Sequence, residues 1–233
     1  MPGVLYLVAV PIGNYDDITF RAIKVLKEAN LVVCEERSEG QRLLHRYGIE
    51  NQIETLNEHN ETAAASVFIN ILKEGKSIAL ISDAGTPVFS DPGRIMVEKA
   101  IRQNIKIIPV PGASSLLPAL IVSGFAIKEF LFAGFLSPKR ERRLTELREL
   151  RKEQRTIVLM DTPYRLVQLL RDMADVFGET RRVCIAFNLT MPDEEIFYGT
   201  APELHKKFQK EEKKGEFVVV LEGKNKQAPN FRK

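Results

Sequence analysis

The stretch at residues 82–93, SDAGTPVFSDPG, contains the residues best suited to chemistry. It follows the apolar run 77–81 and precedes the helical pattern of 94–101, so a strand ends in a polar loop. Asp83 and Asp91 offer acceptors to hydroxyl or amino groups, and Gly85 lets the backbone approach a ligand closely. We expect residues 83–86 to form a ligand loop. For Asp91 the simpler interpretation is an N-cap for the next helix, with Pro92 at its first position.

The elements that would position this loop alternate between strand and helix. This alternation predicts a mostly parallel α/β domain over residues 1–115, in which ligands bind at the carboxyl ends of the strands. Asp16 or Asp17 is a possible cap of the first helix. Strands are expected at 4–10, 31–34, 53–56, 77–81 and 105–110, and helices at 18–29, through 43–47, at 62–73 and at 94–101.

The sequence pattern of the second half, residues 116–225, predicts a further α/β domain. Its sheet should be mixed, because two strand patterns follow one another without a helix between them. We expect the ligand cleft between the two domains and a flexible tail at 226–233. Strands are expected at 131–135, 156–160, 182–187, 196–199 and 216–221, and helices at 118–124, 139–152, 163–177 and 201–211.

Composition favours a soluble globular protein, with 44% hydrophobic and 28% charged residues. Cys34 and Cys184 lie in apolar runs without CxxC spacing, which favours buried thiols in a reducing, cytoplasmic compartment. The first ten residues lack the features of a signal peptide and are too short to cross a bilayer. The net charge of +3 is slight, so any nucleic-acid role must come from local patches.

Several familiar motifs are missing. A nucleotide-phosphate loop fails because Asn70 stands where the first glycine of GxxxxGK[ST] belongs, and the chain contains no GxG fingerprint. The three histidines, His45, His59 and His205, have no paired spacing, so we expect no metal site.

Five stretches together resemble the tetrapyrrole-methylase superfamily, and within it the ribose 2′-hydroxyl methyltransferases of 16S ribosomal RNA. They are 10–19 (VPIGNYDDIT), 58–61 (EHNE), 82–93, 111–115 (PGASS) with 123–124, and 132–136 (FAGFL). The likeness runs from Leu5 to Gly223, without the C-terminal helical extension common in that family. It implies an S-adenosylmethionine-dependent methyltransferase with a two-domain tetrapyrrole-methylase-like α/β fold and the cofactor in the cleft between the domains. It also implies a homodimer that acts on the small ribosomal subunit and does not bind a membrane.

The resemblance carries cofactor-binding positions onto this chain by motif. S-adenosylmethionine has no phosphate, so backbone groups, an acidic or hydroxyl side chain and apolar walls suffice to bind it. Its methyl group is already activated, so catalysis needs in-line positioning and removal of a proton from the acceptor. The cofactor positions are Pro11, Gly13, Ser82, Asp83, Ala84, Gly85, Val88, Ser114 and Ser115 in the first domain, with Leu136, Thr162 and Phe187 in the second.

A base and an RNA-binding surface have several candidates. Glu36, His59 and Glu61 are the candidate bases, beside Glu35 and Glu58, although Glu36 also fits an ion pair with Arg37 and His59 a helix cap. The helix from 139 is dense enough in cations to contact RNA phosphates, and a solvated helix with i,i+4 pairs is the alternative. A second cationic run lies at 206–214. Candidate substrate residues are Arg37, Lys139, Arg140, Arg142, Arg143 and Arg165.

The sequence departs from the family pattern at three places. Residues 36–38 are Glu-Arg-Ser where the family shows Asp-Thr-Arg, and 161–165 are Asp-Thr-Pro-Tyr-Arg where it shows Glu-x-Pro-His-Arg. Residues 187–191 are Phe-Asn-Leu-Thr-Met in place of Arg-Glu-Leu-Thr-Lys, which removes a carboxylate at Asn188 and an ammonium group at Met191. Two alternatives stay open: a methylase of a tetrapyrrole or other small molecule, and a non-catalytic paralogue that binds S-adenosylmethionine.

Overall fold

The computed structural model describes residues 2–211 and 213–224. The chain divides into two compact units between Ser114 and Ser115, one residue before the boundary expected from the sequence. The tail expected at 226–233 lies outside the described residues.

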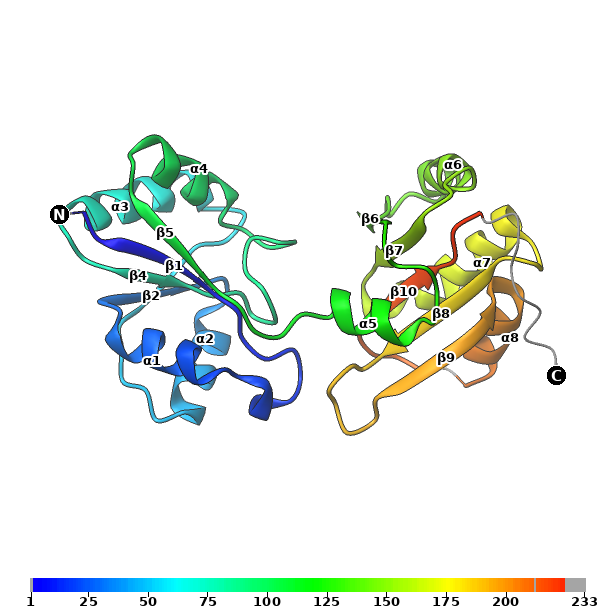
Figure 1. The fold of residues 1–233 in the computed structure, drawn as a ribbon, viewed down its shortest axis with the longest axis horizontal. Coiled ribbons are helices and arrows are strands. Elements are labelled where there is room, and N and C mark those ends of the chain that lie inside the picture. The colour runs from blue at the N-terminus through cyan, green and yellow to red at the C-terminus, as the bar shows by residue number, and fades with distance from the viewer. Residues whose placement is uncertain (1, 212, 225–233) are drawn as a thin grey trace. The chain divides into compact units, whose positions relative to one another are not determined.

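The N-terminal unit is built on a five-stranded sheet with the order β3-β2-β4-β1-β5 (Figure 1). All four strand pairs are parallel, and Leu7 in the centre lies between Leu80 and Pro109. Because every strand points the same way, all five carboxyl ends lie on one edge of the sheet. The strands are β1 (Val4–Val8), β2 (Leu31–Cys34), β3 (Ile53–Thr55), β4 (Ile78–Leu80) and β5 (Lys106–Val110).

Helices cover both faces of this sheet (Figure 1). Apolar residues of α1 (Phe20–Glu28) and α2 (Arg37–Arg46) pack with Val8 and Val32 on one face. Residues of α3 (Glu61–Lys73) and α4 (Arg94–Arg102) pack with Leu5 and Val33 on the other. Alternate residues of one strand thus enter two different cores, as expected for a sheet buried on both sides.

Two local expectations for this unit are wrong. Helix α1 is capped by Thr19, whose hydroxyl oxygen accepts the Ala22 N–H at 3.1 Å, while Asp16 and Asp17 lie in a preceding 3-10 turn, η1 (Tyr15–Asp17). Strand β1 ends at Val8 rather than Val10, because Val10 forms an isolated antiparallel bridge with Gly85 instead of continuing the parallel ladder.

The C-terminal unit contains the expected mixed sheet, with the strand order β6-β7-β10-β8-β9. Strand β6 runs parallel to β7, and the other three pairs are antiparallel. The elements are α5 (Leu116–Val122), β6 (Phe130–Phe135), α6 (Arg140–Leu150), β7 (Thr156–Met160), η2 (Pro163–Arg165), α7 (Leu166–Phe177), β8 (Arg182–Phe187), β9 (Glu195–Thr200), α8 (Ala201–Glu211) and β10 (Phe217–Leu221).

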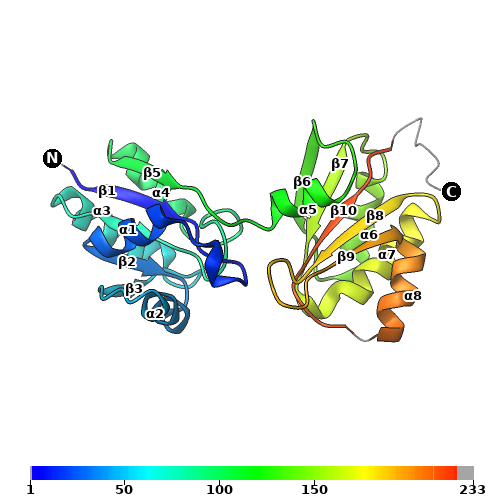
Figure 2. The same cartoon turned by 60° about the horizontal axis from the view of Figure 1, so that its bottom comes forward.

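One core joins α6, α7 and α8 to a single face of this sheet, through residues such as Leu147, Leu170 and Phe208. Helix α5 covers the opposite face, where the hydroxyl of Tyr198 donates to the Val122 carbonyl at 2.6 Å (Figure 2). Helix α6 ends at Leu150 rather than at Lys152, and α5 begins at Leu116, two residues before the expected start at Pro118.

Candidate functional site

Three loops at the carboxyl edge of the N-terminal sheet are joined by hydrogen bonds. Val10 and Gly85 exchange backbone hydrogen bonds of 2.9 and 3.1 Å, which tie the loop after β1 to the loop after β4. The Thr86 hydroxyl donates to the Ala113 carbonyl at 3.2 Å, which adds the loop after β5. The loops that begin at Pro11, Ser82 and Pro111 therefore form one surface, as the strand order requires.

Glycine is required where these loops meet. Gly85 has a φ of +79°, and a Cβ added there would lie 3.1 Å from Cγ2 of Ile12. A larger residue would therefore strain the backbone and force the Ile12 side chain to shift. Val88, in the same loop, has a φ of 70°, which is rare for a β-branched residue and marks a strained position next to the expected ligand site.

The Ser82 side chain supports the loop itself. It is 2% exposed, and its hydroxyl lies 3.1 Å from the Ala84 carbonyl and 3.2 Å from the Gly85 carbonyl. Gly13, Asp83 and Ala84 are exposed beside it, whereas Pro11 is buried. This loop therefore presents backbone groups and the Asp83 carboxylate to solvent.

Carboxylates gather at the ends of β2 and β4. Asp83 accepts the Glu36 N–H at 3.2 Å. Desolvation, with repulsion from Asp83, raises the pKa of the Asp91 carboxyl to about 6. Desolvation also raises the pKa of Glu35, with repulsion from Asp83, Asp91 and Glu58 adding to it. The pKa of Asp83 is raised by desolvation against the lowering effect of its bond to the Glu36 N–H. A cation bound here would relieve these mutual repulsions.

Glu61 caps a helix other than its own. It stands at the start of α3, but its Oε1 accepts the N–H groups of Gly93 at 2.9 Å and Ile95 at 3.0 Å, in the first turn of α4. The cap position of α4 is Gly93, which has no side chain, so Glu61 supplies the missing acceptor. The expectation that Asp91 caps α4, with Pro92 in the helix, is therefore wrong.

The other two candidate bases lie on the surface. Glu36 is exposed, and its backbone N–H is the donor to Asp83. His59 is also exposed, in the turn before α3, where its N–H donates to Oδ1 of Asn57 at 3.1 Å. The cap position of α3 is Asn60, so His59 is not the cap of that helix.

The C-terminal candidates for cofactor binding lie at the carboxyl ends of β6, β7 and β8. Thr162 is exposed and Leu136 is buried. Phe187 is 3% exposed and packs against Phe197 and Phe208, with ring centroids 6.2 and 5.9 Å away. The Phe187 ring therefore belongs to the core of this unit.

Arg143, expected to contact RNA, is an internal residue. It is 2% exposed, and its Nε and Nη2 donate to Oδ2 of Asp172 at 2.9 and 2.7 Å. Its Nη1 donates to the carbonyls of Ser137 and Pro138, both at 3.1 Å. Burial alone would raise the pKa of Asp172, but the bonds from Arg143 and Arg140 outweigh it and lower that pKa. We therefore remove Arg143 from the candidate substrate residues.

Most of the other candidate cations are paired within the protein. Arg37 pairs with Glu54 at 3.1 Å, and Arg142 with Glu146 at 3.3 Å. Arg140 binds Asp172 and Asp175 at 2.9 and 3.0 Å. Arg165 pairs with Asp161 at 3.1 Å and donates to the Ser137 carbonyl at 2.8 Å. In the described part of the chain, Lys139 has no ion-pair partner and is exposed.

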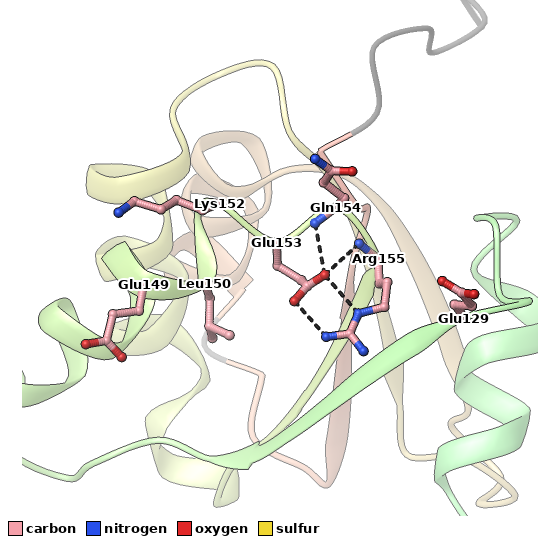
Figure 3. Close-up of a pocket in the computed structure, with 7 residues that line it drawn as sticks. All are labelled: Glu129, Glu149, Leu150, Lys152, Glu153, Gln154 and Arg155. Carbon is pink, nitrogen blue, oxygen red and sulfur yellow. Dashed lines mark hydrogen bonds and ion pairs between the residues drawn. The ribbon is translucent and has the colours of Figure 1, made fainter.

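A large surface hollow lies elsewhere, beside the start of β7 (Figure 3). Its side chains carry both charges, and Arg155 donates through Nη2 to Glu153 at 2.9 Å within it. None of the residues expected to bind the cofactor lines it, so we do not place methyl transfer there. The lining residues are Glu129, Glu149, Leu150, Lys152, Glu153, Gln154 and Arg155.

Among residues 2–211 and 213–224, no cluster of His, Cys, Asp and Glu side chains is arranged to hold a metal ion. No helix in the same ranges is long and apolar enough to span a membrane.

Residues 4–205 match the family of Tetrapyrrole (Corrin/Porphyrin) Methylases. The chain belongs to this family. Membership makes it an S-adenosylmethionine-dependent methyltransferase. The chain is also similar to solved structures of a cobalt precorrin-4 methyltransferase and of uroporphyrin-III-C-methyltransferase from Thermus thermophilus. The TM-scores are 0.67 and 0.66, each at 19% identity and each over 94% of both chains.

Curated relatives are more similar in sequence. A protein of Thermotoga maritima named ribosomal RNA small subunit methyltransferase I is 42% identical over 95% of this chain and 99% of its own length. The Bacillus subtilis protein of the same name is 40% identical over 96% of this chain and 76% of its own length.

The three loops suit S-adenosylmethionine better than a nucleotide phosphate. None of the loops 11–17, 82–93 and 111–115 contains Lys or Arg, and Asp83 and Asp91 lie at one of them. S-adenosylmethionine carries a cationic sulfonium and an ammonium group, which complement carboxylates. Sequence reasoning recognised the loops and included Glu35 among the possible bases, but it did not show the raised pKa of Glu35, which depends on carboxylates from two other segments.

Proposed function

We propose that this chain transfers a methyl group from S-adenosylmethionine to a ribose 2′-hydroxyl of small-subunit ribosomal RNA. The observation that carries the proposal is the joined, cation-free loop surface with its carboxylates, in a chain about 40% identical to methyltransferases named for that RNA. We also propose, from the family resemblance, a homodimer that acts in the cytoplasm.

The charges of the two units are divided in a way that supports an RNA substrate. Residues 1–114 contain 12 Lys and Arg against 14 Asp and Glu, whereas residues 115–233 contain 22 against 17. The excess of cations therefore falls on the C-terminal unit, and the carboxylates that suit a cationic cofactor fall on the N-terminal one. RNA phosphates would be attracted to the C-terminal unit.

In this proposal the cofactor residues hold S-adenosylmethionine chiefly through the backbone. The loops at Pro11 and Gly13, at 82–85 and at Ser114 and Ser115 provide N–H and carbonyl groups, and Asp83 provides a carboxylate. When bound, the cofactor supplies an activated methyl group on its sulfonium. Leu136 and Thr162 are the proposed contacts from the second unit. The proposed role of this chain is to exclude water and hold the acceptor hydroxyl in line with that methyl group.

The acceptor proton needs a base, because a ribose hydroxyl is a poor nucleophile. Glu36 and His59 are exposed, and their side chains have no hydrogen-bond or ion-pair partner within residues 2–211 and 213–224, whereas the Glu61 carboxylate is engaged with α4. Asp91 joins them, because desolvation raises its pKa to about 6, within the range useful for a base near neutral pH.

A small-molecule methylase is the second candidate. It is favoured by the structural likeness to the precorrin and uroporphyrin enzymes, and by the loss of family charges at Asn188 and Met191. Asn188 is buried, with a φ of 46°, and its amide donates to Asp193 at 2.7 Å within its own turn. The same departures favour a third candidate, a non-catalytic paralogue that binds S-adenosylmethionine.

The test begins with calorimetric titration of the chain with S-adenosylmethionine, then measures tritiated methyl transfer to undermethylated 30S subunits. Asp83→Asn should weaken cofactor binding about ten-fold or more, because a bond to a charged group is lost. Glu50→Gln, which removes an exposed carboxylate of the same unit, is the control and should bind as the wild type does. Recovery of the tritiated methyl group in a dinucleotide that resists alkaline hydrolysis would identify the 2′-hydroxyl as the methylated group.

Other outcomes separate the alternatives. Cofactor binding with methyl transfer to a tetrapyrrole, but not to 30S subunits, would replace the RNA proposal by the small-molecule one. Binding without transfer to either acceptor would support the non-catalytic paralogue. No binding at all would remove the proposed cofactor site.

A further inference from the structure

A groove of about 330 Å³ opens in the C-terminal unit, between η2 with α7 on one side and α8 with the residues that follow it on the other. Its volume is near the lower end of the range for small-ligand pockets, roughly 300–1,000 Å³. Phe208, fully buried, and the partly buried Val167 form apolar walls. The lining residues are Pro163, Tyr164, Val167, Phe208, Gln209, Lys213 and Lys214.

Tyr164 is the unusual member of this groove. Its side chain is 78% exposed, although an aromatic ring normally contributes to a core or an interface. The backbone beneath it is firmly held. The Arg165 N–H donates to the Thr162 carbonyl at 2.9 Å, and the Arg165 side chain binds Asp161 and Ser137. The ring therefore stands on a fixed turn, which lowers the entropic cost of stacking a ligand on it.

The two lysines of the groove differ in their availability. Lys213 is engaged: it pairs with Glu195 and Glu211, and its Nζ lies 4.8 Å from the centroid of the Phe197 ring. Lys214 is exposed and has no ion-pair partner among residues 2–211 and 213–224. One side of the groove thus offers an aromatic face, and the other a free ammonium group.

An aromatic face beside a free ammonium group is the combination that binds unpaired nucleotides. The base stacks on the ring and the phosphate pairs with the cation, and neither contact depends on the nucleotide sequence of the RNA. Tyr164 also lies two residues after Thr162, at the carboxyl end of β7, where the proposed cofactor contacts of this unit are found. The net cationic charge of this half of the chain adds to the attraction for RNA.

We propose that the groove between Tyr164 and Lys214 binds an unpaired nucleotide of the RNA substrate, with its base stacked on Tyr164 and its phosphate on Lys214. This inference rests on the proposed RNA methyltransferase function. It identifies a contact between the protein and its RNA substrate at a nucleotide other than the one that is methylated. Neither residue is part of the cation-rich stretch at 139–143 that sequence reasoning selected.

The test measures the affinity of the full chain for a fluorescein-labelled single-stranded RNA decamer by anisotropy, over a range of salt concentrations. Tyr164→Ala should weaken binding about ten-fold, as expected for the loss of one stacked base. Tyr164→Phe keeps the ring and should bind within about two-fold of the wild type. Lys214→Ala should reduce the slope of log K against log salt by about 0.7, the value for one phosphate contact on a single strand.

Matched controls separate the groove from general effects. Tyr198→Ala removes an exposed tyrosine on the face covered by α5, and Lys73→Ala removes an exposed lysine of the other unit. Both should bind the decamer as the wild type does. Calorimetry should give all these variants the cofactor affinity of the wild type, which shows that they are folded.

The outcomes distinguish failure of the groove from failure of the proposed function. If the wild type methylates 30S subunits and Tyr164→Ala binds RNA normally, the groove proposal is wrong and the function stands. Equal losses in Tyr164→Ala and Tyr164→Phe would also overturn it, since stacking needs only the ring. A cofactor affinity that falls in Tyr164→Ala would place Tyr164 in the cofactor site instead.

Two further results complete the test. A wild type that binds the decamer through Tyr164 without methylating any ribosomal RNA would retain the groove and remove the function. A wild type that binds neither the decamer nor 30S subunits would overturn both proposals. Competition by a polycarboxylate porphyrin but not by RNA would assign the groove to an anionic small molecule.

Discussion

Replacing Glu61 distinguishes a capping role from a catalytic one. Its carboxylate accepts two backbone N–H groups of the first turn of α4, and one of them belongs to the buried Gly93 at the end of the loop 82–93. Glu61→Ala leaves both N–H groups without this acceptor. Loss of a cap or of a bond to a charged group costs about 1–3 kcal/mol, so we expect a loss of about 2 kcal/mol in the free energy of unfolding.

Glu61→Gln is the informative companion variant. The amide oxygen of glutamine still accepts hydrogen bonds, so only the attraction between the charge and the helix dipole is lost, which is worth about 0.3–1 kcal/mol. An amide cannot act as a base. A capping role therefore predicts that Glu61→Gln retains methyl transfer and most of the stability, while Glu61→Ala loses stability and binds S-adenosylmethionine more weakly because the end of the cofactor loop is released.

The measurements are urea unfolding followed by far-UV circular dichroism, cofactor titration by calorimetry and methyl transfer to 30S subunits. Glu74→Ala, at the other end of the same helix, removes an exposed surface pair with Lys76 and should change stability by less than about 0.5 kcal/mol. If Glu61→Gln unfolds and binds cofactor as the wild type does but transfers no methyl group, Glu61 is the base and our reasoning is refuted.

Two further predictions concern buried and titrating carboxyls. Asp172→Ala should destabilise the chain by about 3–5 kcal/mol, because it leaves the Arg143 guanidinium buried without its partner. The double variant Arg143→Met with Asp172→Leu should be close to neutral, and urea unfolding of the two variants tests this. The raised pKa of Asp91 predicts that its contribution to stability is present below about pH 4 and lost as pH rises through about 6. Asp91→Asn should therefore stabilise the chain more at pH 7.5 than at pH 4.5, and an equal change in melting temperature at both values would contradict it.

The N-terminal loops could be brought together from sequence because the fold leaves little choice. Five apolar runs separated by helices predict parallel strands, and parallel strands place their carboxyl ends on one edge. Ser82, Pro11 and Pro111 each follow such a run. What the pattern did not show is the bond between Thr86 and Ala113 that fastens two of these loops, because side-chain contacts between distant segments have no local signal.

Capping and ion pairing were harder to predict for the same reason. Cap rules relate a residue to the helix that follows it, so they pointed to Asp91, 2 residues before the cap position of α4. The group that binds the first turn comes from Glu61, 32 residues earlier in the chain than Gly93. Arg143 was likewise grouped with its cationic neighbours, because its partner Asp172 lies 29 residues away on α7.

The departures from the family pattern fall unequally on the two units. Except for residues 36–38, the motifs of the N-terminal unit are retained, and their loops are joined by the hydrogen bonds at Gly85 and Thr86. In the C-terminal unit, Phe187 stands where the resemblance noted in the sequence would place an arginine, and it packs into an aromatic cluster with Phe197 and Phe208.

A buried arginine at residue 187 would need an acceptor, and the adjacent family glutamate is here Asn188, whose amide is bound to Asp193. Replacing both charges together therefore avoids leaving either one buried without a partner. On this argument the divergence changes the interior of the C-terminal unit around Phe187 and leaves the joined loops of the N-terminal unit intact. Substrate recognition, rather than cofactor chemistry, is where this chain is expected to differ from its relatives.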